Sequence, residues 1–340
     1  MSLSKELLSW YDLNRRELPW RGTRDPYRIW LSEIMLQQTR VETVERYYQR
    51  FLERYPTVQA LARAPEDDVL KLWEGLGYYS RARNLHAAAR RVAEELGGAF
   101  PDSASGLRSL PGVGPYAANA IASIAYGEPV PALDGNQARV LSRILAHDAP
   151  LRSPFDLCAP AAEWIDRRRP GDYNQALMDL GASVCTPKKP RCGECPLAAR
   201  CRARESGDPE SFPRKQPPTA KRVESLTVVL VRCGQGVLVR KRPPHGLLAG
   251  LYAFPLIDGH PPLQALPQLL EEEGFRGVRP VQELPRAQHV FTHLVWQMKG
   301  ALVDADEAPE GWIAVTDPYQ VALPSALRRY REIAAELLRP

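Results

Sequence analysis

Four cysteines stand close together in a segment otherwise made of Pro, Lys, Arg and Gly, with the spacing C-x6-C-x2-C-x5-C. Four thiolates within one short loop can wrap a single inorganic cluster, whereas zinc sites usually take two ligand pairs separated by a longer insert. Two disulfides would need an oxidising compartment. The spacing therefore favours one iron–sulfur cluster per chain over zinc or disulfides, with four candidate ligands: Cys185, Cys192, Cys195 and Cys201. We expect the other cysteines, Cys158 and Cys233, to act as small hydrophobic residues.

A glycine-containing turn precedes the cysteine loop, in the run Leu-Pro-Gly-Val-Gly-Pro-Tyr-Ala-Ala at 110–118. Gly112 and Gly114 let the chain turn sharply between helices, and the turn leaves backbone N–H groups free at the start of the next helix. Such a turn can hold a phosphate or a bridging cation. Many helix–helix turns use glycine without any chemical purpose, so the combination with the cysteine loop is what makes the motif specific.

Two carboxylates have contrasting surroundings. Asp134 precedes the helical stretch 137–145, where it reads as an ordinary N-cap, and the same geometry keeps a carboxylate ionised, as stabilising a developing positive charge requires. Glu33 belongs to a helix that Asp25 and Pro26 begin and that is apolar on most sides. Since burying an unpaired carboxylate costs several kcal/mol, we expect Glu33 to be protonated or paired with an arginine.

The elements that must position these groups change character along the 340 residues. The first part is nearly all helical, and the basic excess lies there, which suits either phosphate binding or simple solubility. After a Pro-rich polar connector come alternating runs typical of strands, at 226–231, 237–240 and 290–296, the first two joined by a turn at Gly234–Gly236. We therefore expect a helical domain over 1–205, a linker over 206–222 and a second domain over 223–340.

The N-terminal stretch Met1–Trp10 is polar and amphipathic and lacks the apolar core of a secretory signal. No apolar run approaches the length needed to span a membrane. These features predict a cytoplasmic protein without a membrane partner.

Five segments together resemble a known family: SEIMLQQT around Glu33, GYYSRARNL at 77–85, LPGVGPYAA, ALDGN around Asp134, and the cysteine loop. They are similar to the helix–hairpin–helix DNA glycosylases with a [4Fe–4S] cluster, and among these to the adenine DNA glycosylases (MutY family), over nearly the whole chain. The resemblance implies an all-α helix–hairpin–helix glycosylase domain with an iron–sulfur loop, followed by an α+β Nudix-like domain that recognises 8-oxoguanine. It implies a nucleoid-associated monomer that excises adenine opposite 8-oxoguanine or guanine in duplex DNA.

Tyr116 sets the subfamily. The related endonuclease III has a lysine at this point of the hairpin motif, whose amine attacks the sugar and permits strand cleavage. A phenol cannot form a Schiff base. Tyr116 therefore favours a monofunctional glycosylase.

The resemblance also gives roles to individual residues. Glu33 would protonate adenine and then activate water, while Asp134 would stabilise the cation-like sugar with support from Asn136 and Tyr116. Other matching positions form the adenine pocket (Trp20, Arg21, Leu36, Gln175), contact DNA (Gln38, Tyr78, Gly112, Val113, Gly114) or recognise 8-oxoguanine (Phe291, Thr292, His293). For Trp20 and Leu36, core packing is the alternative interpretation.

The chain departs from the family pattern at three places. The segment 250–274 lacks the Arg-Glu-x-x-Glu-Glu core of a catalytic Nudix box, so we expect no nucleotide hydrolysis. Thr292 replaces the usual serine, and its extra methyl stiffens the side chain. Asn119 stands where small residues are common and is expected to face solvent. The competing functions are a pyrimidine-directed glycosylase, a DNA-binding module without chemistry and a nucleotide-pool hydrolase.

Overall fold

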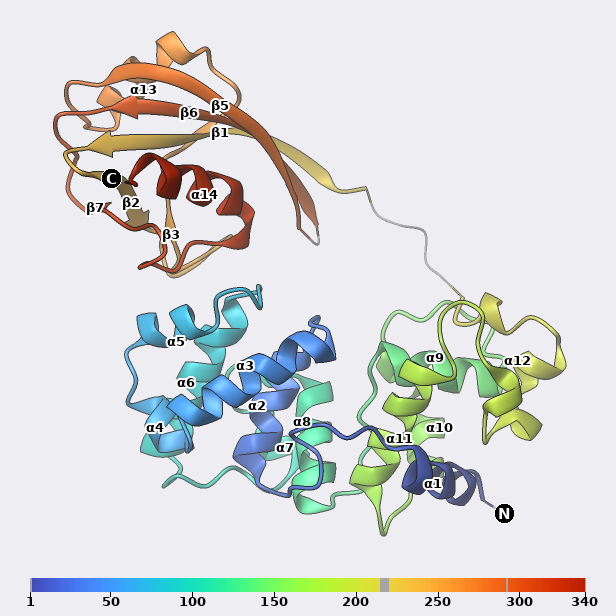
Figure 1. Ribbon diagram of the computed structural model, residues 1–340. Helices are drawn as coiled ribbons and strands as arrows, with labels where there is room; N and C mark the ends of the chain where they lie inside the picture. Colours follow the sequence, from blue (N-terminus) through green and yellow to red (C-terminus); the bar gives the residue numbers. More distant parts are fainter. Residues whose placement is uncertain (1, 215–219, 292, 340) are drawn as a thin grey trace. The chain divides into compact units, whose positions relative to one another are not determined.

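The computed structural model describes residues 2–214, 220–291 and 293–339. Its contacts form two compact units (Figure 1). The first consists of Met1–Ala64 with Arg83–Pro218, and the second of Pro65–Ala82 with Thr219–Pro340. A short helical segment from the first half of the sequence thus groups with the strand-rich half.

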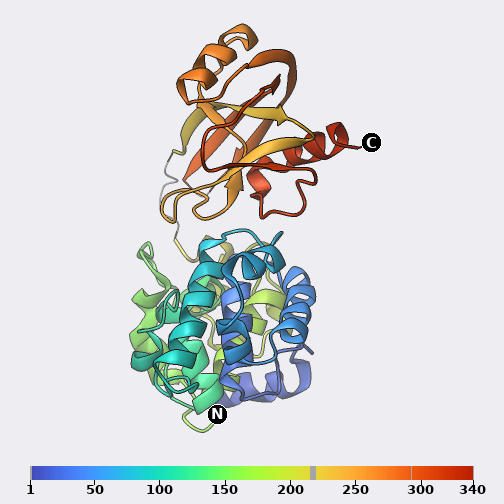
Figure 2. The same ribbon diagram turned by 90° about the vertical axis from the view of Figure 1, so that its left-hand side faces the viewer.

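The first unit is built of helices (Figure 2). Its α-helices are α1 (Leu3–Asn14), α2 (Pro26–Leu36), α3 (Val41–Arg54), α4 (Val58–Ala62), most of α6 (Ser80–Glu94), α7 (Ala104–Leu107), α8 (Pro115–Ile121), α9 (Gly135–Leu145), α10 (Cys158–Trp164), α11 (Pro170–Ser183) and α12 (Arg202–Glu205). A π-helix, η1 (Ala122–Tyr126), continues α8, and single 3₁₀ turns occupy η2 (Pro154–Leu157), η3 (Cys192–Glu194), η4 (Ala198–Arg200) and η5 (Pro209–Ser211).

Helix α2 lies inside the first unit. Asp25 caps it by accepting a hydrogen bond from the backbone N–H of Tyr27, and Pro26 takes the first helical position, as the sequence predicts. Every residue from Ile29 to Met35 is buried, and the helix packs against α3, α8 and η1. Glu33 therefore belongs to a helix that solvent hardly reaches.

A separate apolar core joins α1, α9 and α11 to the cysteine loop. Leu7, Val140 and Tyr173 are fully or almost fully buried in it, and Leu197 of the loop inserts into the same cluster. Burial of these side chains fixes the loop against the helices that carry Asp134 and Gln175.

The second unit contains a mixed sheet of seven strands. The strands are β1 (Arg222–Cys233), β2 (Gly236–Lys241), β3 (Tyr252–Ala253), β4 (Leu256–Asp258), β5 (Arg279–Val290), β6 (Leu294–Asp304) and β7 (Trp312–Val315). They are ordered β3-β2-β1-β6-β5, with β4 added to β1 and β7 to β2; β1 and β6 are parallel. The helical elements are α5 (Glu66–Leu72), η6 (Leu263–Ala265), α13 (Leu266–Glu272), η7 (Ser325–Leu327) and α14 (Arg328–Leu337).

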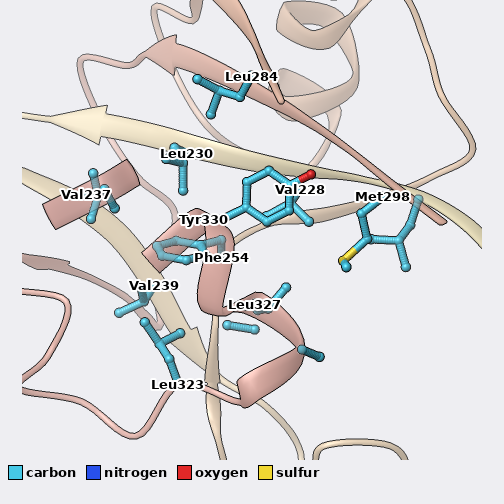
Figure 3. Packing of buried hydrophobic residues seen from close by; sticks show 14 of the residues in the cluster. Val228, Leu230, Val237, Val239, Phe254, Leu284, Met298, Leu323, Leu327 and Tyr330 are labelled. Atoms are coloured by element: carbon cyan, nitrogen blue, oxygen red, sulfur yellow. The ribbon is translucent and has the colours of Figure 1, made fainter. Parts of the chain in front are cut away.

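The sheet buries both faces because side chains alternate along β1. Val228 and Leu230 point toward Tyr330 of α14, as Figure 3 shows. Val229 and Val231 belong to the opposite cluster, which contains Leu270 of α13. One helix thus covers each face of the sheet.

The expected strand at 290–296 is wrong. Strand β5 ends at Val290 and β6 begins at Leu294, and the two pair antiparallel with Val290 opposite Val295. Alternating apolar residues look alike in one strand and in two strands joined by a short turn, so the sequence did not show the turn. The turn at Gly234–Gly236 is confirmed: Gly234 has φ +59° and Cys233 pairs with Gly236.

Among the helices in the described ranges, none has the length and apolar character that crossing a membrane requires. The expectation that Cys158 and Cys233 behave as small hydrophobic residues agrees with their places. Each is a free, half-buried thiol packed against an apolar cluster.

Candidate active site

A small pocket in the helical unit surrounds the carboxyl group of Glu33 and has a free volume of about 50 Å³. Its walls come from the segment before α2, from α2 itself, from α8 and η1, and from α11. All four residues that the resemblance places around adenine line it together with Glu33 and Tyr116. The complete lining is Arg16, Leu18, Trp20, Arg21, Ile29, Ser32, Glu33, Leu36, Val41, Tyr116, Ile124, Gln175 and Met178.

Glu33 is 5% exposed, and its Oε2 atom has no hydrogen-bond partner within the described part of the chain. Burial raises the pKa of this carboxyl group to about 7, and the nearby charge of Asp134 acts in the same direction. A hydrogen bond with Tyr116 and the charge of Arg21 oppose the rise. A substantial fraction of Glu33 is therefore protonated at neutral pH, so the residue can donate a proton into the pocket.

Tyr116 belongs to the first turn of α8 and lines the same pocket. Burial raises the pKa of its hydroxyl well above the ordinary value, and the negative charges of Glu33 and Asp134 add to this. The hydroxyl also lies 3.7 Å from the sulfur of Met178. Tyr116 therefore remains a neutral phenol that donates hydrogen bonds.

Arg21 is held in place by a buried aspartate. Its two terminal nitrogens each lie 3.1 Å from an oxygen of Asp179, and one also donates to the Tyr11 hydroxyl at 2.6 Å. Asp179 is 1% exposed and also binds Arg16 at 2.7 Å. A bidentate guanidinium–carboxylate pair is strong and directional. Arg21 thus presents a fixed positive charge to the pocket.

Asp134 is the N-cap of α9. Its Oδ1 accepts a hydrogen bond from the backbone N–H of Gln137 at 2.8 Å, and its Oδ2 accepts one from the side-chain amide of Asn136 at 3.1 Å. These two donors fix the orientation of the side chain at the start of the helix. Asp134 is close enough for its charge to act on both Glu33 and Tyr116.

Two amide side chains hold the segment that leads to Asp134. Asn119 donates to the carbonyl of Pro131 at 2.8 Å, so the expectation that it faces solvent is wrong: it is half-buried and its amide finds a backbone partner. Asn174, fully buried, donates to the carbonyl of Val130 at 3.0 Å and accepts from the N–H of Ala132 at 3.0 Å. The cap residue therefore follows a segment fixed by buried hydrogen bonds.

The four predicted cluster ligands line the wall of one cavity, together with Arg143, Val184, Pro190, Ala198, Arg204 and Pro209. Burial raises the pKa of the Cys195 thiol to about 11 and also raises that of Cys201. Buried thiols of this kind ionise when a metal group compensates their charge. Within the part of the chain that the structure describes, no three His, Cys, Asp or Glu side chains are arranged around a single metal ion. Four cysteines that line one cavity within a short loop fit a [4Fe–4S] cluster.

Arg143 ties the cysteine loop to α9. Its guanidinium, 1% exposed, donates to the carbonyls of Thr186, Pro187 and Phe212 at 2.7–3.2 Å and lies 3.3 Å from the sulfur of Cys185. These hydrogen bonds fix the start of the loop against α9.

Arg139 lies one helical turn before Arg143. It donates to the side-chain oxygen of Asn136 at 2.9 Å and to the carbonyl of Cys185 at 2.9 Å. Since Asn136 also binds Asp134, a continuous path of polar contacts joins the helix cap to the cluster loop.

The hairpin turn requires glycine at position 112, whereas a Cβ at Gly114 would meet no atom within 4 Å. Gly112 has φ +74°, and a Cβ there would lie 2.6 Å from the Cβ of Asn84. Gly114 is the N-cap of α8 and precedes Pro115 at the first helical position. Val113 between them is buried. The turn therefore exposes backbone rather than side chains, as contact with a phosphate backbone requires.

The two residues expected to enter the base stack share an unusual backbone. Gln38 has φ +57° and is exposed, and Tyr78 has φ +48° and is 49% exposed. Left-handed conformations are strained for residues other than glycine and persist where the surroundings enforce them, often at functional sites. Behind Tyr78, the buried guanidinium of Arg81 lies 5.6 Å from its ring and binds the carbonyls of Leu76 and Gly77.

Two of the expected lesion-reading residues, Phe291 and His293, lie between the end of β5 and the start of β6. The ring of Phe291 packs edge-on between His289 at 4.5 Å and Trp296 at 5.0 Å. His293 is exposed, and Thr292 lies outside the described residues. The structure thus places Phe291 and His293 at the end of a long hairpin.

Sequence reasoning missed several residues that position the site: Arg16, Arg81, Asn174, Asp179, Arg139 and Arg143. A signal for one of them was present. Asp179 interrupts the apolar run Ala176–Leu180, the same pattern that singled out Glu33. Arg16, Asn174 and Arg143 bind partners that lie far away in the sequence.

Three family models match the chain. Residues 31–155 match the HhH-GPD superfamily of base excision DNA repair proteins, residues 185–201 match the iron–sulfur binding domain of endonuclease III, and residues 227–332 match the NUDIX domain. The second match agrees with the sequence prediction of the cofactor: residues 185–201 are the binding loop of a [4Fe–4S] cluster.

The chain is also similar to characterised proteins over most of its length. It is 38% identical to the adenine DNA glycosylase of Homo sapiens, over 95% of this chain and 72% of that protein, and 40% identical to that of Rattus norvegicus, over 85% and 68%. The structure of a thermostable thymine-DNA glycosylase superimposes with a TM-score of 0.54 at 30% identity, covering 60% of this chain and 95% of that one. Because the similarity to the first two spans both units of the fold, the chain belongs to the adenine DNA glycosylase family.

Proposed function

We propose that this protein removes adenine from duplex DNA by hydrolysing its N-glycosidic bond, and that its targets are adenines opposite 8-oxoguanine or guanine. The observation that carries the proposal is the contrast between the surroundings of two carboxyl groups. Glu33 is buried and its pKa is raised to about 7, while Asp134 is held at a helix cap by hydrogen-bond donors. One carboxyl group that keeps its proton and one that stays ionised suit hydrolysis of a bond to a sugar.

In this mechanism Glu33 acts as the general acid. Adenine leaves poorly as an anion, so a proton from Oε2 to a ring nitrogen turns it into a neutral leaving group. The pocket shields the carboxyl proton of Glu33 from water. Arg21, which Asp179 holds in place, restricts the position of the adenine ring. After the bond breaks, the ionised Glu33 can accept a proton from the attacking water.

Asp134 stabilises the positive charge that develops on the sugar. Its carboxylate needs no reorganisation, because Gln137 and Asn136 already hold it. Tyr116, a phenol with a strongly raised pKa, donates a hydrogen bond and offers no amine for a Schiff base. We therefore expect base removal without strand cleavage.

The test is an incubation of purified protein with labelled duplexes that hold adenine opposite 8-oxoguanine, guanine or thymine, and thymine opposite guanine. We expect free adenine from the first two, with strand breaks that appear only after alkali. Efficient borohydride trapping of a protein–DNA adduct would instead identify a bifunctional enzyme. Preferred release of thymine would favour the pyrimidine-directed alternative, which the similarity to a thymine-DNA glycosylase makes worth including.

For the second domain, over 223–340, we propose recognition of the base opposite the adenine. Phe291 is held between two rings and would act as an apolar wedge, and Thr292 together with the exposed His293 would supply polar contacts to the lesion. The acidic run at Glu271–Glu273 is exposed at the end of α13, without the Arg-Glu-x-x-Glu-Glu core, which supports a reading role rather than nucleotide hydrolysis.

Replacing Thr292 and His293 by alanine tests this role. Each well-placed polar contact to a base is worth about 1–3 kcal/mol, so the double variant should lose roughly one to a few orders of magnitude of its preference for 8-oxoguanine over guanine. Excision opposite guanine should change far less. Equal losses on both duplexes would mean that the turn serves general binding.

Gln38, Tyr78 and the turn at Gly112–Gly114 would hold the duplex while the base is extruded. We further propose that the protein works as a monomer in association with the nucleoid, because one chain carries both carboxylates, the cluster loop and the reading domain. Sedimentation of the complex with one duplex would test the stoichiometry.

A further inference from the structure

A second cavity adjoins the pocket around Glu33. Its free volume is about 210 Å³, and it lies among the residues just before α2, the π-helix η1 and the start of α11. Trp20, Ile124 and Gln175 line both cavities. These three side chains therefore form the wall between the two spaces.

The two cavities differ in what they can hold. A water needs about 10–15 Å³ of such space and a benzene molecule about 150 Å³. The pocket at Glu33, with about 50 Å³, has room for a few waters, whereas the second cavity, with about 210 Å³, has room for an aromatic ring. A base can enter the first pocket only when wall side chains shift, and a shift of the three shared residues would join the two spaces.

The mouth of the second cavity is open. Gly22 and Gly127 lie there, and a Cβ at either glycine would meet no atom within 4 Å. Arg24 and Arg168 are exposed beside them. Guanidinium groups of this kind stack on the faces of nucleobases.

A second opening would be useful because of the order of base extrusion, bond cleavage and base release. An extruded nucleotide stays attached to its strand, so its sugar and phosphates block the path by which the base entered. After cleavage, the free base lies beyond that sugar, while none of the residues proposed to contact the rest of the duplex (Gln38, Tyr78 and Gly112–Gly114) lines the second cavity. We propose that the second cavity is the exit through which the freed purine leaves while the DNA product is still bound. This inference rests on the proposed function.

The experiment follows two events in one single turnover with base-labelled duplex. Strand breaks after alkali report bond cleavage, and label that passes a protein-retaining filter reports base release. Thr23→Trp and Arg24→Trp narrow the mouth, while Thr23→Ser and Arg24→Lys are the matched controls. Neither position belongs to the catalytic pocket.

In both Trp variants we expect cleavage at the unaltered rate and release slowed about tenfold or more, as a blocked product exit requires. The controls should release base in step with cleavage. Release that keeps pace with cleavage in both Trp variants would overturn the exit, and so would an equal fall of cleavage and release. If the unaltered protein produces no strand breaks after alkali, the proposed function itself fails. If it produces them but the Trp variants release base normally, only the exit fails.

Discussion

Two parts of the helical unit hold the same functional group in opposite ways. Around Glu33 the protein supplies apolar walls, one phenol and a fixed arginine, and the carboxyl group keeps its proton to about pH 7. Around Asp134 it supplies a backbone N–H and an amide at the start of a helix. The difference shows that the chemistry of a carboxyl group is set by its surroundings.

The largest effect is expected from Glu33→Gln, which keeps the volume of the side chain and removes the proton donor. General acid catalysis is worth about 10²–10⁴ in rate, so single-turnover base release should fall by at least that range while DNA binding persists. Glu42→Gln, at an exposed position of α3, is the matched control. A variant of Glu33 with near-normal rates would remove this residue from the mechanism.

Asp134→Asn keeps the helix cap and removes the charge. Loss of one preorganised electrostatic contact typically costs about 10²–10³ in rate, and we expect a decrease of that size in single-turnover assays. Asp25→Asn changes another N-cap aspartate, at the start of α2, and should leave the rate intact. Similar decreases for both variants would show that helix capping, and not charge at the site, is what matters.

The buried acid should also reduce stability at high pH. The pKa of Glu33 is raised from 4.5 to about 7, so the folded state holds a proton that the unfolded state loses across this interval. The free energy of unfolding therefore falls as pH rises from 4.5 to 7, by roughly 3 kcal/mol in total. Denaturant titrations should find Glu33→Gln more stable than the unaltered protein at pH 8 and no more stable at pH 4.

The pH dependence of the activity should follow the titration of Glu33. The rate of base release should be level just below pH 7 and fall about tenfold per pH unit above it, because only protonated Glu33 is an acid. Tyr116→Phe removes a hydrogen bond that lowers the pKa of Glu33, so the descending limb should move to higher pH. If the descending limb of the pH–rate profile does not move in Tyr116→Phe, a group other than Glu33 controls it.

The smallest effect is expected from the hydrogen bond that holds the segment before Asp134. Asn119→Ala removes the hydrogen bond to Pro131, and since a net hydrogen bond is worth about 0.5–1.5 kcal/mol, the rate should fall about two- to tenfold. In an Asp134→Asn background the same change should cost little more, because the residues act together. Additive losses would place Asn119 outside the path to Asp134.

The sequence alone determined several local features of the candidate site. Asp25, Pro26 and Asp134 are local helix signals, and the structure places each where the pattern predicts. The cysteine spacing is equally local, and its interpretation is confirmed by the family match at 185–201. Local patterns succeed because the contacts that explain them lie within a few residues of each other.

Only the tertiary structure decided how these groups are held. Asp179 meets Arg21 and Asn119 meets Pro131 through packing of separate segments, and the turn between β5 and β6 follows from strand pairing rather than from composition. The raised pKa of Glu33 likewise depends on which helices exclude water from α2. Such properties arise from contacts between residues distant in the chain, and a single sequence does not show which of these residues come into contact.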